Sequence, residues 1–99
     1  MIKPYYTDYV RHMLRFYSRY LHSKSFRTEV DRQNWNACHK VIEGYSPRDK
    51  DILTFVYGEM DTIADNVFAI SKKFKINQSI VWDMMSKLEK EVAIERGLV

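Results

Sequence analysis

The sequence is poor in residues that interrupt helices or cross-link chains. Its 99 residues include only three glycines and two prolines. So few turn formers disfavour a fold of many short strands and favour a few long helices. A single cysteine, Cys38, excludes an intramolecular disulfide framework and is typical of a reducing compartment. We therefore expect an all-α protein that is not stabilised by disulfides.

Long apolar runs are also missing. No stretch approaches the roughly 18 consecutive apolar residues of a membrane-spanning helix. Met1–Tyr6 contains no apolar signal-peptide core. These absences predict a soluble, cytoplasmic protein without a membrane partner. The chain is also too short for a (β/α)₈ barrel, which needs roughly 200 residues or more.

The sequence does contain many apolar residues, and its charges are unevenly distributed. Hydrophobic residues make up 45% of the chain and aromatic residues 14%, which is enough for a buried core. The net charge of +3 divides into +4 over residues 1–45, −3 over residues 46–66 and +2 over residues 67–99. This distribution predicts that any contact with a polyanion involves the two ends of the chain.

Apolar periodicity and capping residues predict five helices, at about residues 5–21, 29–44, 47–58, 63–75 and 78–95. The expected N-caps are Thr28, Ser46, Thr62 and Asn77, and Pro47 suits the first position of the third helix. We expect residues 1–45 to form an N-terminal extension of two helices and residues 46–99 to form a tri-helical core.

The first helix has an apolar stripe and a basic stripe. The apolar stripe is expected to be buried and contains Tyr6, Val10, Met13, Tyr17 and Tyr20, widened by Tyr9, Leu14, Phe16 and Leu21. Arg11, Arg15 and Arg19 are spaced four residues apart on another side. They form either a solvated face or a surface that contacts phosphate or an acidic protein.

Residues 67–88 have the pattern of a helix-turn-helix. A small residue, Ser71, stands where the two helices would cross, and Ile76 is placed to fill the turn. Asn77 caps the second helix, and Val81 with Met84 or Met85 packs back. Lys75 occupies the turn position where glycine is usual, at a cost of about 1 kcal/mol for a left-handed conformation.

Residues 46–92 resemble region 4 of sigma-70-type factors. The resemblance rests on an opening at Ser46-Pro47-Arg48, an apolar helix ending at Tyr57-Gly58-Glu59, and the helix pair that follows. The N-terminal half does not resemble sigma region 2. The chain therefore looks like the small sigma-region-4-like proteins of phages and mobile elements in Gram-positive bacteria. That resemblance implies sequence-specific binding of double-stranded DNA in transcriptional regulation, with RNA polymerase as a further partner.

The chain departs from the family pattern at three places. The connection from Glu59 to Ile70 is several residues longer, and Ser71 and Lys75 replace the usual small residue and glycine. The helix expected to read DNA is poor in arginine. Asp83 stands where the family often has a basic residue.

The expected DNA contacts lie on the last two helices. We expect Gln78, Ser79 and Trp82 to read bases, because N-terminal residues of a recognition helix reach base edges. Asp83 either accepts a hydrogen bond from cytosine N4 or repels phosphate. With about 3–5 phosphate contacts, the salt slope would be about −3 to −4.5. The full set of candidates is Lys72, Lys73, Lys75, Gln78, Ser79, Trp82, Asp83, Ser86, Lys87 and Lys90.

Several of these residues have a structural alternative. Trp82 could pack against the N-terminal extension, and the lysines could form an ordinary solvated surface. A second function follows from Asp83 and the arginine face, namely a protein-interaction module that docks on RNA polymerase or another partner. Either function leaves open whether the protein is a homodimer, and a dimer would bind half-sites about 34 Å apart or a multiple of that distance.

No residue pattern points to catalysis. Cys38 and His39 are adjacent on a helix and point about 100° apart, which does not suit a shared metal or a thiolate–imidazole pair. His12 and His22 are the other histidines. The sequence contains neither a glycine-rich phosphate loop nor a His-Glu-x-x-His motif. We expect no enzyme activity, no cofactor and no bound metal.

Overall fold

The structure is a computed structural model that describes residues 3–21 and 25–99. Within them the chain forms five helices and no strand: α1 (Thr7–Arg19), α2 (Glu29–Ile42), α3 (Pro47–Gly58), α4 (Ile63–Phe74) and α5 (Gln78–Glu95). The expected all-α class is confirmed. None of these helices is both long enough and apolar enough to span a membrane.

Local side chains determine where the helices begin. Thr28, Ser46 and Thr62 each accept a hydrogen bond from the backbone N–H three residues later, and Pro47 occupies the first position of α3. Asn77 accepts from the N–H of Ser79 at 2.9 Å. These bonds satisfy N–H groups that a helix leaves without an intrahelical partner. All four N-caps expected from the sequence are confirmed.

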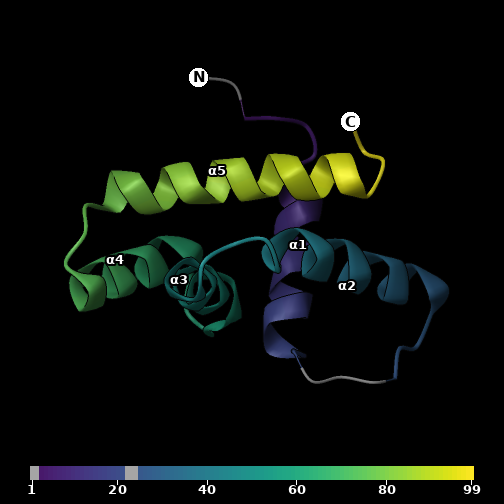
Figure 1. The fold of residues 1–99 in the computed structure, drawn as a ribbon, viewed down its shortest axis with the longest axis horizontal. Coiled ribbons are helices and arrows are strands. Elements are labelled where there is room, and N and C mark those ends of the chain that lie inside the picture. Colours follow the sequence, from purple (N-terminus) through teal and green to yellow (C-terminus); the bar gives the residue numbers. More distant parts are fainter. Residues whose placement is uncertain (1–2, 22–24) are drawn as a thin grey trace.

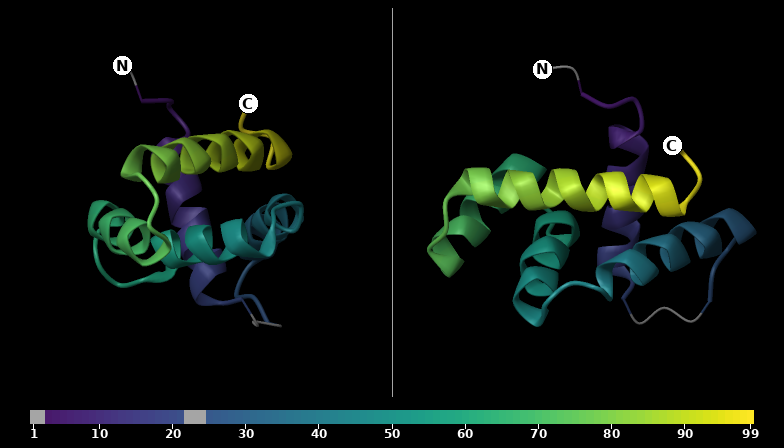
Figure 2. Two further views of the ribbon diagram at one scale, coloured as in Figure 1. Left: turned by 60° about the vertical axis from the view of Figure 1, so that its left-hand side comes forward. Right: turned by 45° about the horizontal axis from the view of Figure 1, so that its top comes forward.

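The long helix α5 forms one side of the molecule, and the other helices pack under and across it (Figures 1 and 2). In the view of Figure 1, α3 and α4 lie under its N-terminal half, α2 lies under its C-terminal half, and α1 crosses behind it. Contacts join α5 to each of the other four helices. The two ends of the chain come together on this side, where the Tyr5 hydroxyl donates to the carbonyl of Leu98.

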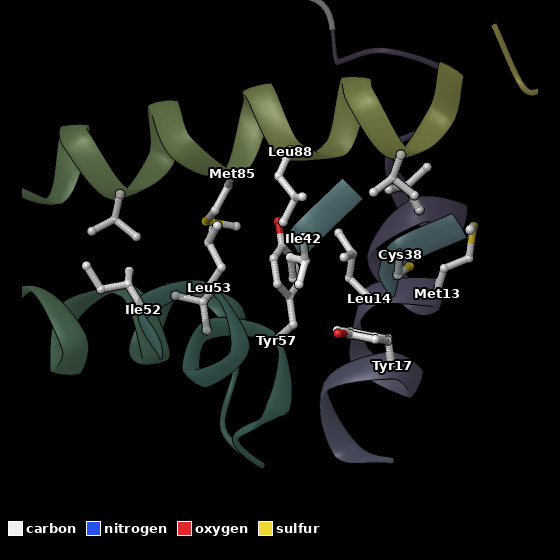
Figure 3. Close-up of a cluster of buried hydrophobic side chains, with 14 of the residues drawn as sticks. Met13, Leu14, Tyr17, Cys38, Ile42, Ile52, Leu53, Tyr57, Met85 and Leu88 are labelled. Atoms are coloured by element: carbon white, nitrogen blue, oxygen red, sulfur yellow. The ribbon is translucent and has the colours of Figure 1, made fainter. Parts of the chain in front are cut away.

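One hydrophobic cluster connects all five helices. Val10, Leu14, Leu53, Val67 and Leu88 are among its fully buried members. Figure 3 shows side chains from α1, α2, α3 and α5 meeting in it, with the ring of Tyr57 rising from α3 towards α5. Both sequence segments, 1–45 and 46–99, thus contribute to the same core. The expected boundary at residue 45 stays a prediction.

The apolar stripe of α1 was predicted only in part. Tyr20, Tyr9 and Leu21 were expected to be buried, but they are 54%, 43% and 39% exposed. Tyr20 and Leu21 lie beyond the last residue of α1, which ends two residues earlier than expected. On α5, Met84 is half-buried, whereas Glu89 is buried among apolar residues.

Candidate nucleic-acid interface

The corner between α4 and α5 has the residues that the sequence assigned to it. Lys75 adopts the left-handed conformation, with φ at +55°. The N–H of Ile76 donates to the carbonyl of Ser71 at 3.0 Å, and the N–H of Lys75 donates to that of Lys72 at 3.3 Å. These two bonds form a Schellman motif, which satisfies the last carbonyls of α4. Ser71 is buried and Ile76 packs against the core. These local expectations are confirmed.

The outward side of α5 carries a line of exposed polar residues. A helix turns about 100° per residue, so residues spaced by four, three and four lie along one side. Ser79, Asp83, Ser86 and Lys90 have this spacing, and all four are exposed. We call these four residues the outer line. Lys87 and Ile94 flank it and are exposed as well.

Gln78 and Trp82 lie to one side of the outer line, towards α1. Gln78 is exposed in the first turn of α5. Trp82 is half-buried, and the guanidinium carbon of Arg11 lies 5.9 Å from the centre of its ring. This contact corresponds to the packing alternative for Trp82. Of the polar candidates on α5, Gln78, Asp83, Ser86 and Lys90 project outwards without a side-chain hydrogen bond within the described chain, whereas the Ser79 hydroxyl donates to Asn77 Oδ1 at 3.1 Å.

The lysines in residues 3–21 and 25–99 fall into two groups according to their partners. Lys3, Lys40 and Lys50 form ion pairs with Asp8, Glu95 and Glu43, respectively. The five lysines that were expected to contact phosphate form no ion pair within the described chain, and all are exposed: Lys72, Lys73, Lys75, Lys87 and Lys90. The described lysines that no carboxylate engages thus lie on α4, the turn and α5.

Two of these lysines lie over aromatic rings. The Nζ of Lys72 lies 4.5 Å from the centre of the Phe68 ring, and the Nζ of Lys87 lies 5.5 Å from that of Tyr45. Tyr45 in turn donates its hydroxyl proton to Glu91. Cation–π contacts at exposed sites are weak, roughly 0.5–1 kcal/mol. Both ammonium groups keep donors free for an anion.

Behind the outer line, a buried carboxylate joins three helices. Glu89 on α5 is 4% exposed and accepts hydrogen bonds from the Tyr57 hydroxyl at 2.6 Å and from Arg11 Nε at 2.9 Å. Burial, with the Glu89 carboxylate as a further cause, raises the pKa of Tyr57 well above its ordinary value, so the phenol stays a donor. Arg11 therefore contacts both Glu89 and Trp82, which places α1 against α5.

Arg15 and Arg19 bind the end of α3. Arg15 donates to the carbonyls of Tyr57, Glu59 and Asp61 at 3.2–3.3 Å. Arg19 donates to the carbonyls of Gly58 and Glu59 at 3.3 and 3.4 Å. The C-terminus of a helix has unpaired carbonyls and a partial negative charge, and both favour a cation there. The sequence offered only a solvated face or an intermolecular surface, so this internal role of the arginines is a correction.

The arginine contacts hold the long connection between α3 and α4. Asn66, which is 2% exposed, donates from Nδ2 to the carbonyl of Val56 at 2.8 Å and to those of Glu59 and Asp61 at 3.3 Å. Periodicity gave no signal for these contacts, because their partners lie 5 to 46 residues apart. The signal available in the sequence was a polar residue at the spacing of the apolar side of a helix, as with Asn66 between Ile63 and Ile70 and Glu89 between Met85 and Val92.

Cys38 and His39 are engaged in packing. Cys38 is fully buried, and burial raises the pKa of its thiol to about 12. His39 stacks on Trp35, with ring centres 4.7 Å apart, and its Nδ1 lies 3.0 Å from the Tyr17 hydroxyl. Across residues 3–21 and 25–99, no three His, Cys, Asp or Glu side chains gather closely enough to hold a metal ion. His22 lies outside the described residues.

Comparison of the chain with protein-family models, with curated proteins and with solved structures found no match.

Proposed function

We propose that the protein binds double-stranded DNA sequence-specifically, through a helix-turn-helix formed by α4 and α5 and supported by α3. The observation that carries the proposal is the grouping of the lysines described above. The five without a carboxylate partner lie around the corner and on the exposed part of α5. The corner itself has the left-handed residue, buried serine and Asn77 cap that such a helix pair requires.

In this mechanism the lysines bind phosphate and α5 enters the major groove. Lys72 and Lys73 lie in the last turn of α4, and Lys75 lies in the connection to α5. Lys87 and Lys90 lie farther along α5. Ammonium groups bind phosphate without regard to sequence, so they supply affinity and orientation. Exposed polar residues near the start of α5 supply base contacts. The protein would act in transcriptional regulation.

The proposal is tested by measuring binding of a labelled duplex over a series of salt concentrations. We expect the logarithm of the association constant to fall linearly with the logarithm of salt, with a slope of about −3 to −4.5. A double variant, Lys72→Ala/Lys73→Ala, should reduce the magnitude of that slope by about 2. Lys40→Ala/Lys50→Ala removes the same charge from two ion-paired lysines and should leave the slope unchanged.

Two results would overturn the proposal. One is the absence of salt-sensitive binding to any duplex from the protein's own gene neighbourhood. The other is an equal change of slope in both double variants, which would indicate that net charge alone governs binding. The protein-docking function stays a prediction. The arginine face that helped to motivate it is not available to a partner, because Arg11, Arg15 and Arg19 bind within the chain.

A further inference from the structure

Asp83 stands alone as a carboxylate on the outer line of α5. It is exposed and makes no hydrogen bond or ion pair within the described chain. Lys87, four residues later, is in the right position to neutralise it. The ammonium group of Lys87 instead lies over the Tyr45 ring, at 5.5 Å. The first half of α5 therefore presents an uncompensated negative charge outwards.

An unpaired carboxylate is costly beside DNA unless it meets a hydrogen-bond donor, because phosphates surround the groove. The major groove offers donors only at cytosine N4 and adenine N6. Adenine places the N7 acceptor beside its amino group, and that acceptor repels a carboxylate, whereas cytosine presents the amino donor alone. A carboxylate facing the base edges therefore favours cytosine.

The position of Asp83 along α5 suits such a contact. It is the sixth residue of a helix that begins at Gln78. Ser79, on the same line, lies four residues earlier, or about 6 Å along the helix axis at 1.5 Å per residue. That distance corresponds to about two base-pair steps of 3.4 Å. Ser79 and Asp83 are thus spaced to face base pairs about two steps apart.

We infer that Asp83 is a specificity-determining residue that selects a cytosine in the DNA target. This inference rests on the proposed function. Under this inference, residues of the outer line of α5 contact the bases in place of Trp82, which Arg11 contacts. Ser79 tolerates several bases, so of these two residues Asp83 sets the stronger preference.

The test is selection of bound duplexes from a random-sequence pool by the full chain, followed by sequencing. The wild-type protein should enrich a motif with an invariant C·G pair. Asp83→Asn should keep the rest of the motif but prefer A·T at that one position, because asparagine pairs bidentately with adenine. Asp83→Ala should lose the preference there. Asp51→Asn, at an exposed position on α3, removes the same charge and should select the wild-type motif.

Binding measurements should agree with the selection. Replacing the selected C·G pair should weaken wild-type binding by about 5- to 100-fold, with a much smaller effect on Asp83→Ala. Identical motifs for the wild type and Asp83→Asn would overturn this inference and leave DNA binding intact. Tighter binding of every sequence by both variants would show that Asp83 only repels phosphate. No enrichment by the wild type would overturn the proposed function as well.

Discussion

Glu89 shows how a single residue can be essential to the arrangement of the helices. Its carboxylate is 4% exposed on the apolar side of α5, where an isolated charge would be strongly unfavourable. Arg11 and Tyr57 supply the two donors that make this burial tolerable. Removing one partner of such a group costs more than the pair itself contributes, because the remaining charge stays buried.

We predict that Arg11→Met lowers the free energy of unfolding by about 2–4 kcal/mol at pH 7, measured by urea denaturation. The double variant Arg11→Met/Glu89→Leu should recover most of that loss, because no unpaired charge remains. Lys40→Met is the matched control. It breaks another ion pair to α5, but an exposed one, and should cost less than about 1 kcal/mol. Equal losses for Arg11→Met and Lys40→Met would contradict the role of Glu89.

At the scale of elements, the ends of the helices were predictable and the contacts between helices were not. A cap is a local event, so Thr28, Ser46 and Asn77 could be identified from two or three neighbouring residues. The contact of Arg15 with the end of α3 joins residues more than 40 positions apart. Periodicity placed Arg15 correctly off the apolar stripe of α1, but it carries no information about which element lies opposite.

The turn before α5 offers a test of local conformation. A left-handed conformation costs a residue with a side chain roughly 1–2 kcal/mol, and glycine escapes this cost but loses more entropy on folding. We therefore predict that Lys75→Gly raises the free energy of unfolding by about 0.5–1 kcal/mol. Lys73→Gly, which lies in the last turn of α4, should lower it by about 1 kcal/mol. A loss of stability in both variants would contradict the assigned conformation of Lys75.

At the scale of the whole molecule, the sequence predicted the helical class, and the structure shows which candidate site residues are exposed. The five lysines and Ser79, Asp83 and Ser86 are exposed, as residues available to DNA must be. Trp82 was expected to read bases, and the side chain of Arg11, which also binds Glu89, lies over its ring. A helical wheel of α5 alone cannot reveal which side another helix covers. The two basic segments of the chain also differ in their contacts. Arg11, Arg15 and Arg19 bind other residues of the chain, whereas the lysines of α4 and α5 face solvent.

The shared core also makes the whole fold sensitive to alkaline pH. Burial, followed by the charges of Glu43 and Cys38, raises the pKa of Tyr17 to about 12, and burial raises that of Cys38 to about 12. Tyr57 is raised well above its ordinary value by burial and by Glu89. In the unfolded chain these groups lose their protons at about pH 9–10. Between that pH and the folded pKa values, the unfolded state binds fewer protons, so stability must fall as the pH rises.

We therefore predict that the contribution of these groups to the free energy of unfolding is constant below about pH 9. It should fall progressively between about pH 9 and 12, as measured by urea denaturation at each pH. Tyr17→Phe removes one of the groups, so it should show a smaller loss over this range, even if its stability at pH 7 is lower because the contact with His39 is gone. Tyr20→Phe alters a phenol that is 54% exposed and should keep the wild-type pH dependence. Since Tyr17 joins α1 to α2 and Tyr57 joins α3 to α5, alkaline unfolding should be a single transition when followed by both helical content and tryptophan fluorescence. Two separate transitions would show that the helices do not share one cooperative core.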